Sequence, residues 1–530
     1  SDREMITDLN REFKEEIYIK ISMKGATMGN RIANVWKKVV ENTIPILFIA
    51  ILIFYLIQCQ IWQCDNSYYK VVGLAIIGVI ICYYIGYKLC SKIESKSAKK
   101  YKLFLFIVSF VIYVLWGIFA KTPPISDYEV LINGAKSMAR GEFPTLAFDK
   151  TNYFYFYNFQ AGFVTYLAGI IKLFGERLIF IKLVEMLVMS LTNVFIYDIA
   201  TKIYSRRCGV MSSMIYAILL FNIAGSSIIN NQHISVLFMV IALWLFLKDR
   251  KLLHVLAGIF TGIAIIVRPS IAIFAIALIC FKIWKVLDNN LKNFLKELFT
   301  IVILVISIFI TVKGYDAAMR YSNQVPNSAV SANAKYFKFI LGLKGRGLYN
   351  IQTQTAEKTQ VYYDLEKLNF DYEKYDEECL KELKTSINYN TRILLRFINE
   401  KLVYFCGGAD NQLGYAWEYV STSRICDFMN YYGYIQYILL LLLALISSVI
   451  IFYKNKDMEY EGKNRKYSEL LKILFIGFFL AHIFIEVQTR YRYEQYLVLA
   501  ILSSPVLVIL FDKITKILDK YKKDTTEIKI

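Results

Sequence analysis

The chain has 530 residues, of which 56% are hydrophobic, and its mean hydropathy is +0.42. Soluble domains are about 45–50% apolar even when glycine is counted, so this composition excludes an ordinary water-soluble globular protein. The net charge is +19, but the basic residues lie beside apolar runs and not on a soluble basic fold, so we exclude a nucleic-acid partner and expect contact with membrane lipids.

The first 40 residues are polar and charged. Within them Met5, Leu9, Phe13 and Ile17 recur at a four-residue step, which predicts an amphipathic helix on the cytoplasmic side. We interpret this helix as an anchor on the membrane surface, and a binding role is the alternative. Because this segment lacks an apolar core, we expect the first membrane span to act as its own insertion signal.

Twelve apolar runs follow, most of them close to the roughly 20 residues that a membrane-crossing helix needs. The runs are continuous and do not alternate, so they predict helices and not a β-barrel. The predicted spans are 44–62, 71–90, 103–120, 179–203, 209–229, 234–248, 252–267, 269–286, 298–313, 434–453, 469–487 and 494–512.

Lysine and arginine cluster after every second predicted span, around Lys96, Arg206, Arg250, Lys285, Arg465 and Lys516. With twelve spans and a cytoplasmic N-terminus, each cluster falls on the cytoplasmic side, as the positive-inside rule requires. One more crossing, at the apolar stretch 158–174, would place Arg206 outside. We therefore predict that 158–174 is a juxtamembrane helix at the outer interface.

Together these patterns predict an all-α polytopic membrane protein in five parts. They are a cytoplasmic amphipathic segment (1–43), a transmembrane catalytic module (44–313) with its first outer loop (121–178), an extracellular loop segment (314–432), C-terminal transmembrane helices (433–512) and a basic cytoplasmic tail (513–530). The nine cysteines include no CxxC pair and the chain has three histidines, so no structural zinc site is predicted.

Cysteine accessibility tests this topology. We expect a cysteine introduced by Lys463→Cys to be protected from an impermeant thiol reagent outside intact cells, because position 463 is predicted to be cytoplasmic. A cysteine introduced by Asn350→Cys should react, because position 350 lies in the predicted extracellular segment. Labelling of position 463 from outside would contradict the topology.

We expect functional residues where charged side chains lie at the outer boundary of the membrane, because a charge there is costly. Pro123 and Pro124 end the third span, and Asp127 follows at once, before a helix-like stretch that Gly141 stops. Asp127 is open to two interpretations. It is either the N-cap of this helix, which binds free backbone N–H groups, or a functional carboxylate at the bilayer surface.

The residues Asp127-Tyr128, Ala135 and Arg140-Gly141-Glu142-Phe143-Pro144 resemble the first outer loop of the GT-C superfamily of membrane glycosyltransferases. This group includes protein O-mannosyltransferases and lipid A aminoarabinose transferases. The segment Tyr153–Gly162 is similar to their juxtamembrane segment, although many members have proline where this chain has Asn158. The second outer loop, around His233, lacks the acid that many relatives carry there.

Three further landmarks follow in family order. Arg268-Pro269 matches a basic-Pro pair, and a snorkelling interfacial arginine is the alternative interpretation. A Gly-rich stretch containing Lys344 and Arg346 resembles a motif of bacterial Gram-positive relatives. The stretch from Glu486 to Arg490 and Arg492 resembles a Glu…Arg-Tyr landmark before the final helix, with an interfacial belt as the alternative.

The resemblance implies a GT-C-like bundle that transfers a sugar from a polyprenyl-phosphate donor, with inversion, on the outer face of a bacterial cell membrane. It implies Asp127 as the catalytic base and a set of substrate- and phosphate-binding residues: Arg268, Arg490, Arg492, Lys344, Arg346, Tyr128, His233 and Glu486. The implied partners are an undecaprenyl-phosphate-linked sugar and a cell-envelope glycan, lipid or protein. No cofactor is certain, and a divalent metal stays open.

Two other functions remain as alternatives. A transporter or flippase for lipid-linked saccharides would have charges near the bilayer middle and broken helices in corresponding halves. A polysaccharide polymerase or ligase would share the outer arginines and the large outer loop. The charges singled out above lie at the outer ends of the predicted spans, and the largest loop is on one side only, which favours the transferase.

Overall fold

The computed structural model describes residues 38–39, 42–59, 69–93, 97–287, 291–343, 365–387, 391–408, 410, 416, 423–453 and 466–527. The amphipathic helix predicted from Met5 to Ile17 lies outside these residues, and so do Lys344 and Arg346. The described part of the chain is built from helices and contains no β-strand, which confirms the predicted all-α membrane fold.

Eight described helices are long and apolar enough to cross a membrane. They are Asn42–Cys59, α3 (Ala98–Ala120), α8 (Leu178–Ile203), η3 (Pro269–Ile271) with α13 (Ala272–Leu287), α14 (Leu291–Tyr321), α20 (Ser423–Tyr453), α21 (Tyr467–Phe484) and η5 (Thr489–Arg492) with α22 (Tyr493–Glu527). Three shorter apolar stretches lie in α2 (Tyr69–Ile93), α11 (Asn231–Phe246) and α12 (Lys251–Val267). These helices coincide with eleven of the twelve predicted spans.

The remaining predicted span, 209–229, is broken. It forms α9 (Arg206–Ile218) and α10 (Leu220–Gly225), with extended backbone at Leu219 between them. The side chain of Gln436 on α20 satisfies the backbone at the break, because its Oε1 accepts from Leu220 N–H at 2.8 Å and its Nε2 donates to Ile218 C=O at 3.2 Å. A backbone polar group left unpaired inside a bilayer costs several kcal/mol, so the helix can break here only because Gln436 supplies a partner.

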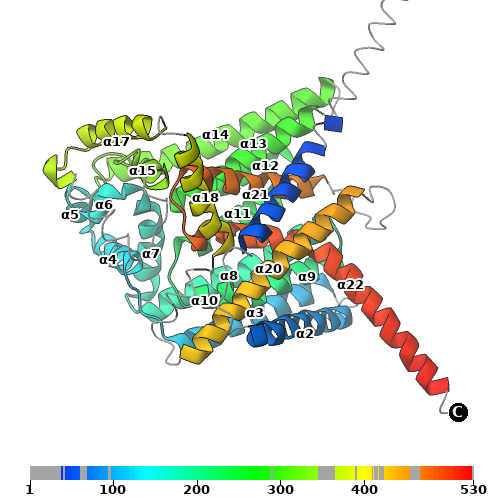
Figure 1. Ribbon diagram of the computed structural model, residues 1–530. Coiled ribbons are helices and arrows are strands. Elements are labelled where there is room, and N and C mark those ends of the chain that lie inside the picture. Colours follow the sequence, from blue (N-terminus) through cyan, green and yellow to red (C-terminus); the bar gives the residue numbers. More distant parts are fainter. Residues whose placement is uncertain are drawn as a thin grey trace, which may run out of the picture.

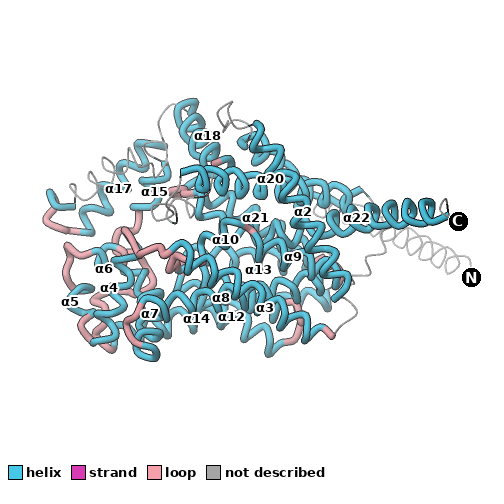
Figure 2. The backbone as a smooth tube through the Cα atoms, turned by 90° about the horizontal axis from the view of Figure 1, so that it is seen from below, coloured by secondary structure: helices cyan, strands magenta, loops and turns pink. Residues whose placement is uncertain are grey.

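The first outer loop folds into short helices at one end of the bundle. After α3, the Pro-Pro segment leads into α4 (Asp127–Arg140), which ends at Gly141 in a left-handed conformation. Then come α5 (Phe143–Ala147), α6 (Tyr153–Phe156), η2 (Asn158–Gln160) and α7 (Ala161–Phe174). Figures 1 and 2 both show α4 to α7 gathered at the end of the molecule opposite the free end of α22.

The helix predicted over 158–174 is present as α7. Its 14 residues extend about 21 Å, which is too short for roughly 30 Å of hydrocarbon. α7 packs on α4 and against the end of α12. The approach to α12 requires glycine at position 162, since a Cβ there would lie 1.9 Å from the carbonyl oxygen of Ile266.

The segment predicted to be extracellular also contains helices. α14 continues past the predicted span as far as Tyr321, and α15 (Phe337–Leu343), α17 (Tyr372–Ile387) and α18 (Thr391–Gly407) follow. α15 packs on α17, α18 and α21. In Figure 1, α15 and α17 lie at the same end of the molecule as α4 to α7.

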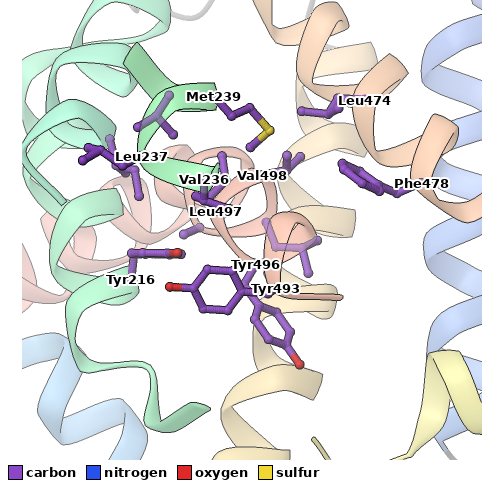
Figure 3. Close-up of a cluster of buried hydrophobic side chains, with 14 of the residues drawn as sticks. Tyr216, Val236, Leu237, Met239, Leu474, Phe478, Tyr493, Tyr496, Leu497 and Val498 are labelled. Carbon is purple, nitrogen blue, oxygen red and sulfur yellow. The ribbon is translucent and has the colours of Figure 1, made fainter. Parts of the chain in front are cut away.

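The core beneath this end forms where α9, α11, α21 and α22 meet. Figure 3 shows Met239 of α11 near Leu474 of α21 and Val498 of α22, and all three side chains are buried. Phe478 of α21 also belongs to this core and forms part of the floor of the cavity described below. Packed helices therefore support the cavity.

Candidate functional site

A cavity of about 500 Å³ opens where the first outer loop meets the ends of several long helices. Residues from at least five separate segments line it. The charged side chains among them are Asp127, Arg268, Lys338, Glu486, Arg490 and Glu494. Five of the residues that the sequence predicts for the site are brought together here: Asp127, Tyr128, Arg268, Glu486 and Arg490.

Asp127 is the first residue of α4, and the N-cap position is taken by Ser126. Ser126 has φ 54° and ψ −132°, a positive-φ conformation that non-glycine residues rarely adopt, so the backbone is strained immediately before Asp127. The Asp127 side chain is partly exposed to the cavity, and its carboxylate accepts no hydrogen bond from any described residue. Lys338 acts on Asp127 electrostatically, but in the described part of the chain Asp127 forms no ion pair, whereas Glu486 and Glu494 do.

Arg490 contacts Tyr128, the neighbour of Asp127. A guanidinium N–H of Arg490 donates to the Tyr128 hydroxyl, and the guanidinium carbon lies 5.4 Å from the centre of the Tyr128 ring. Arg490 is 9% exposed, and Gln232 fixes its backbone by donating to the Arg490 carbonyl at 2.8 Å. A cation is thus held against Tyr128, in the same cavity as the candidate base.

Arg268 forms a buried ion pair with Glu494, with Nε 2.7 Å from Oε1. Its Nη1 donates to Oδ1 of Asn231 at 2.9 Å, at the start of α11. Its side chain is 12% exposed, so Arg268 is directed into the protein and does not snorkel to water. Glu494 is fully buried, and its second carboxylate oxygen has no hydrogen-bond partner among the described residues, so it can still accept one.

Glu486 is paired with Lys338 of α15, whose ammonium group lies within ion-pair distance of the Glu486 carboxylate. Gln488 Nε2 also donates to this carboxylate, at 3.0 Å. Burial opposes the charge on Glu486, but Lys338, Gln488 and Arg490 outweigh it and hold the pKa of Glu486 below its ordinary value. Glu486 therefore stays ionised and engaged near neutral pH, which makes it a poor proton acceptor.

Two residues predicted for the site do not line the cavity. His233 is buried, and its Nδ1 lies 2.8 Å from Oε2 of Glu185 on α8. Arg492 is fully buried and donates to the backbone carbonyl oxygens of Thr489, Cys406 and Gly408, at 2.7–3.1 Å. In the structure Arg492 therefore joins η5 to the end of α18, away from the cavity.

In the described part of the chain, the carboxylates of the cavity are not gathered into a metal-binding cluster. Carboxylate oxygens are the ligands that a divalent cation would need. Those of Glu486 and Glu494 already contact Lys338 and Arg268. Within the described ranges no group of three or more His, Cys, Asp or Glu residues could hold a metal.

Several cavity residues were not predicted from the sequence. Lys338 belongs to no predicted motif, and Asn231 was not singled out within the second outer loop; both are paired with distant segments, to Glu486 and Arg268. Glu494 could have been found, because it is an acid at the start of an apolar span, where a charge is costly without a partner.

Comparison with known protein families gives a match to part of the chain. Residues 163–313 match the family model described as dolichyl-phosphate-mannose-protein mannosyltransferase. No curated protein matches the chain.

Among solved structures, the chain is similar to the Archaeoglobus fulgidus oligosaccharyltransferase AglB in complex with an inhibitory peptide and a dolichol-phosphate, at 16% identity and a TM-score of 0.48, over 80% of this chain and 52% of that one. It is also similar to the oligosaccharyltransferase of the same organism tethered with an acceptor peptide, at 15% identity and a TM-score of 0.45, over 78% and 50% of the two chains. The chain thus spans about half the length of these proteins. The family match covers residues 163–313, less than half of the chain, and it agrees with the resemblance of the first outer loop to the GT-C superfamily.

Proposed function

We propose that this protein transfers a sugar from a polyprenyl-phosphate donor, such as undecaprenyl phosphate, to a hydroxyl group of a cell-envelope acceptor on the outer face of a bacterial membrane. The observation that carries the proposal is the placement of Asp127. Its carboxylate accepts no hydrogen bond from the described residues, and it lies in the same cavity as Arg490 and Arg268. A base and phosphate-binding cations are the groups that this transfer needs.

In the proposed reaction, the Asp127 carboxylate takes the proton of the acceptor hydroxyl as the oxygen attacks the anomeric carbon. The bond between this carbon and the phosphate oxygen breaks, and the lipid phosphate leaves with its negative charge. Attack opposite the leaving group inverts the anomeric centre. A positioned base contributes typically about 10²–10⁴-fold to such a rate.

Arg490 is the cation that we assign to the departing phosphate. Its planar guanidinium can donate to a phosphate oxygen, and Tyr128 and Gln232 hold it in position. Charge that develops on the leaving group is stabilised most by donors that are already in place. Arg268 lies in the same cavity but is neutralised by Glu494, so we assign it mainly to holding the cavity wall.

Replacing Arg490 should weaken donor binding. We expect Arg490→Ala to reduce the affinity for undecaprenyl phosphate by about 10- to 100-fold, the cost of losing a charge-assisted contact at a largely buried site. Arg490→Lys should recover only part of this loss, because lysine lacks the planar fork. The measurement is a binding titration with protein in detergent micelles.

Tyr128→Phe is the matched control for this titration. It keeps the aromatic ring beside Arg490 and removes only the hydroxyl contact, so its effect on affinity should be much smaller. Equal affinity of the wild type and Arg490→Ala for undecaprenyl phosphate would exclude Arg490 as a phosphate ligand.

A transfer assay tests the function itself. Purified protein is incubated with a panel of undecaprenyl-phosphate sugars and with candidate glycan, lipid and protein acceptors. Transfer from one of these donors, with release of undecaprenyl phosphate, supports the proposal. Binding of the donors followed by their movement across liposome membranes, without release of the sugar, would support the transporter alternative.

A further inference from the structure

A loop after α14 forms part of the cavity wall, and Asn158 holds it in place. Asn158 lies in η2 and is 4% exposed. Its Nδ2 donates to the carbonyl oxygens of Ser328 and Ser331, and its Oδ1 accepts from Asn333 N–H at 3.0 Å. Asn158 thus binds the backbone of residues 327–333, here called the 327–333 loop, at three points. A proline at this position could make none of these side-chain contacts.

The same loop has a second anchor on α14. Oδ1 of Asp316 accepts from the Ser328 hydroxyl and from Ala329 N–H, both at 2.7 Å, and Asp316 is 3% exposed. Nδ2 of Asn333 in turn donates to the Tyr155 carbonyl of α6 at 2.8 Å. Because residues of α6, η2 and α14 all bond to it, the loop has one defined position relative to the cavity.

The side chains that this loop presents to the cavity are small and apolar. Val330 and Ala332 line the cavity, together with the aromatic residues Tyr153, Tyr157 and Phe159 of the neighbouring segment. The charged lining residues come from α4, α15 and the segments around η3 and η5. The cavity therefore has an uncharged wall, made by α6, η2 and the 327–333 loop, in addition to its charged groups.

We propose that Asn158 is a positioning residue that fixes the 327–333 loop, and that Val330 and Ala332 limit the size of the sugar that the cavity accepts. This inference rests on the proposed function, since it assigns the lipid phosphate to the charged groups and the sugar to the uncharged wall. The hydrogen bonds hold the backbone of this wall in place, and its small side chains leave room for a sugar of limited size. A sugar with a larger substituent can bind only if the loop is displaced, so the wall selects sugars by shape.

The test compares binding of undecaprenyl phosphate alone with binding of its pentose, hexose and N-acetylhexosamine derivatives. Ala332→Leu fills the space beside the wall. It should reduce the affinity for the sugar derivative that the wild type binds most tightly by about 10-fold or more, which is the size of effect that extra methylene groups have in a hydrophobic pocket. Its affinity for undecaprenyl phosphate without a sugar should stay within about 2-fold of the wild type, since the phosphate-binding groups are unchanged.

Asn158→Asp tests the positioning role. The side chain keeps its size but loses both donors, and its carboxylate faces the carbonyl oxygens of Ser328 and Ser331. We expect the affinities for the three sugar derivatives to become similar, while undecaprenyl phosphate itself binds as before. The matched control is Asn152→Ala, which removes the N-cap hydrogen bond to Phe154 N–H in the same segment, and it should keep the wild-type order of affinities.

The outcomes separate the two proposals. If the wild type binds neither undecaprenyl phosphate nor its sugar derivatives, the proposed function is wrong and this inference falls with it. If the wild type binds and ranks them, but Ala332→Leu and Asn158→Asp both keep its affinities and order, the proposed function stands and the inference is overturned. Should Asn158→Asp fail to fold, Ala332→Leu alone decides in the same way.

Discussion

Asp127→Asn should fold, insert and bind donor, yet transfer sugar more slowly than the wild type by about 100-fold or more. Asparagine keeps the size of the side chain and can still lie in the first turn of α4, but it cannot accept a proton. The alternative interpretation of Asp127 as an N-cap loses support, since Ser126 occupies that position. A purely structural Asp127 would make the asparagine variant almost silent.

Glu129→Gln is the matched control. Glu129 is an acid in the same turn of α4 but is exposed and does not line the cavity, so its replacement should leave transfer near normal. Single-turnover rates and donor affinity, measured for both variants, separate chemistry from binding. Near-normal transfer by Asp127→Asn would remove Asp127 as the base. Glu494, with its unpartnered oxygen, would then be the next acid to test.

Arg268→Ala should destabilise the protein by about 3–5 kcal/mol, because it leaves the fully buried Glu494 carboxylate without its cation. The expected result is a clear fall in the thermal unfolding temperature in detergent. Asn231 would also lose its hydrogen bond from Arg268, which loosens the start of α11. Loss of donor binding in this variant would therefore be largely a consequence of lost structure.

A double variant distinguishes stability from ligand binding. Arg268→Ala with Glu494→Gln removes the buried charge together with its partner, so most of the lost stability should return. If the unfolding temperature of Arg268→Ala already equals that of the wild type, the Arg268–Glu494 pair is not a buried ion pair of the kind described. If the double variant is stable but does not bind donor, while Glu494→Gln alone still binds it, Arg268 also contacts the ligand directly.

The sequence predicted the helices well because a bilayer imposes a simple rule. Every backbone group must be bonded within the span, so a continuous apolar run becomes a helix. The break at Leu219 could not be seen in this way. It contains no proline or glycine, and it depends on Gln436, which lies 216 residues from Leu220 along the chain and bonds the backbone groups that the break leaves unpaired.

The site was predicted in part for a related reason. Asp127 and Arg490 stood out because charges at span ends are costly, and the structure places both in one cavity. The cost of a charge at a span end does not show whether an arginine faces a ligand or donates to backbone carbonyl oxygens. Arg492 carries the same signal as Arg490, yet its donors are directed to the carbonyl oxygens of Cys406 and Gly408.

The most direct test is an electron cryomicroscopy structure of the protein with an undecaprenyl-phosphate sugar bound. We predict density for the phosphate within about 3 Å of the Arg490 guanidinium, with the sugar between Asp127 and the wall formed by Val330 and Ala332. Phosphate density elsewhere, for example at the basic turns around Lys248 or Lys285, with the cavity around Asp127 empty of the donor, would contradict the proposed transferase site.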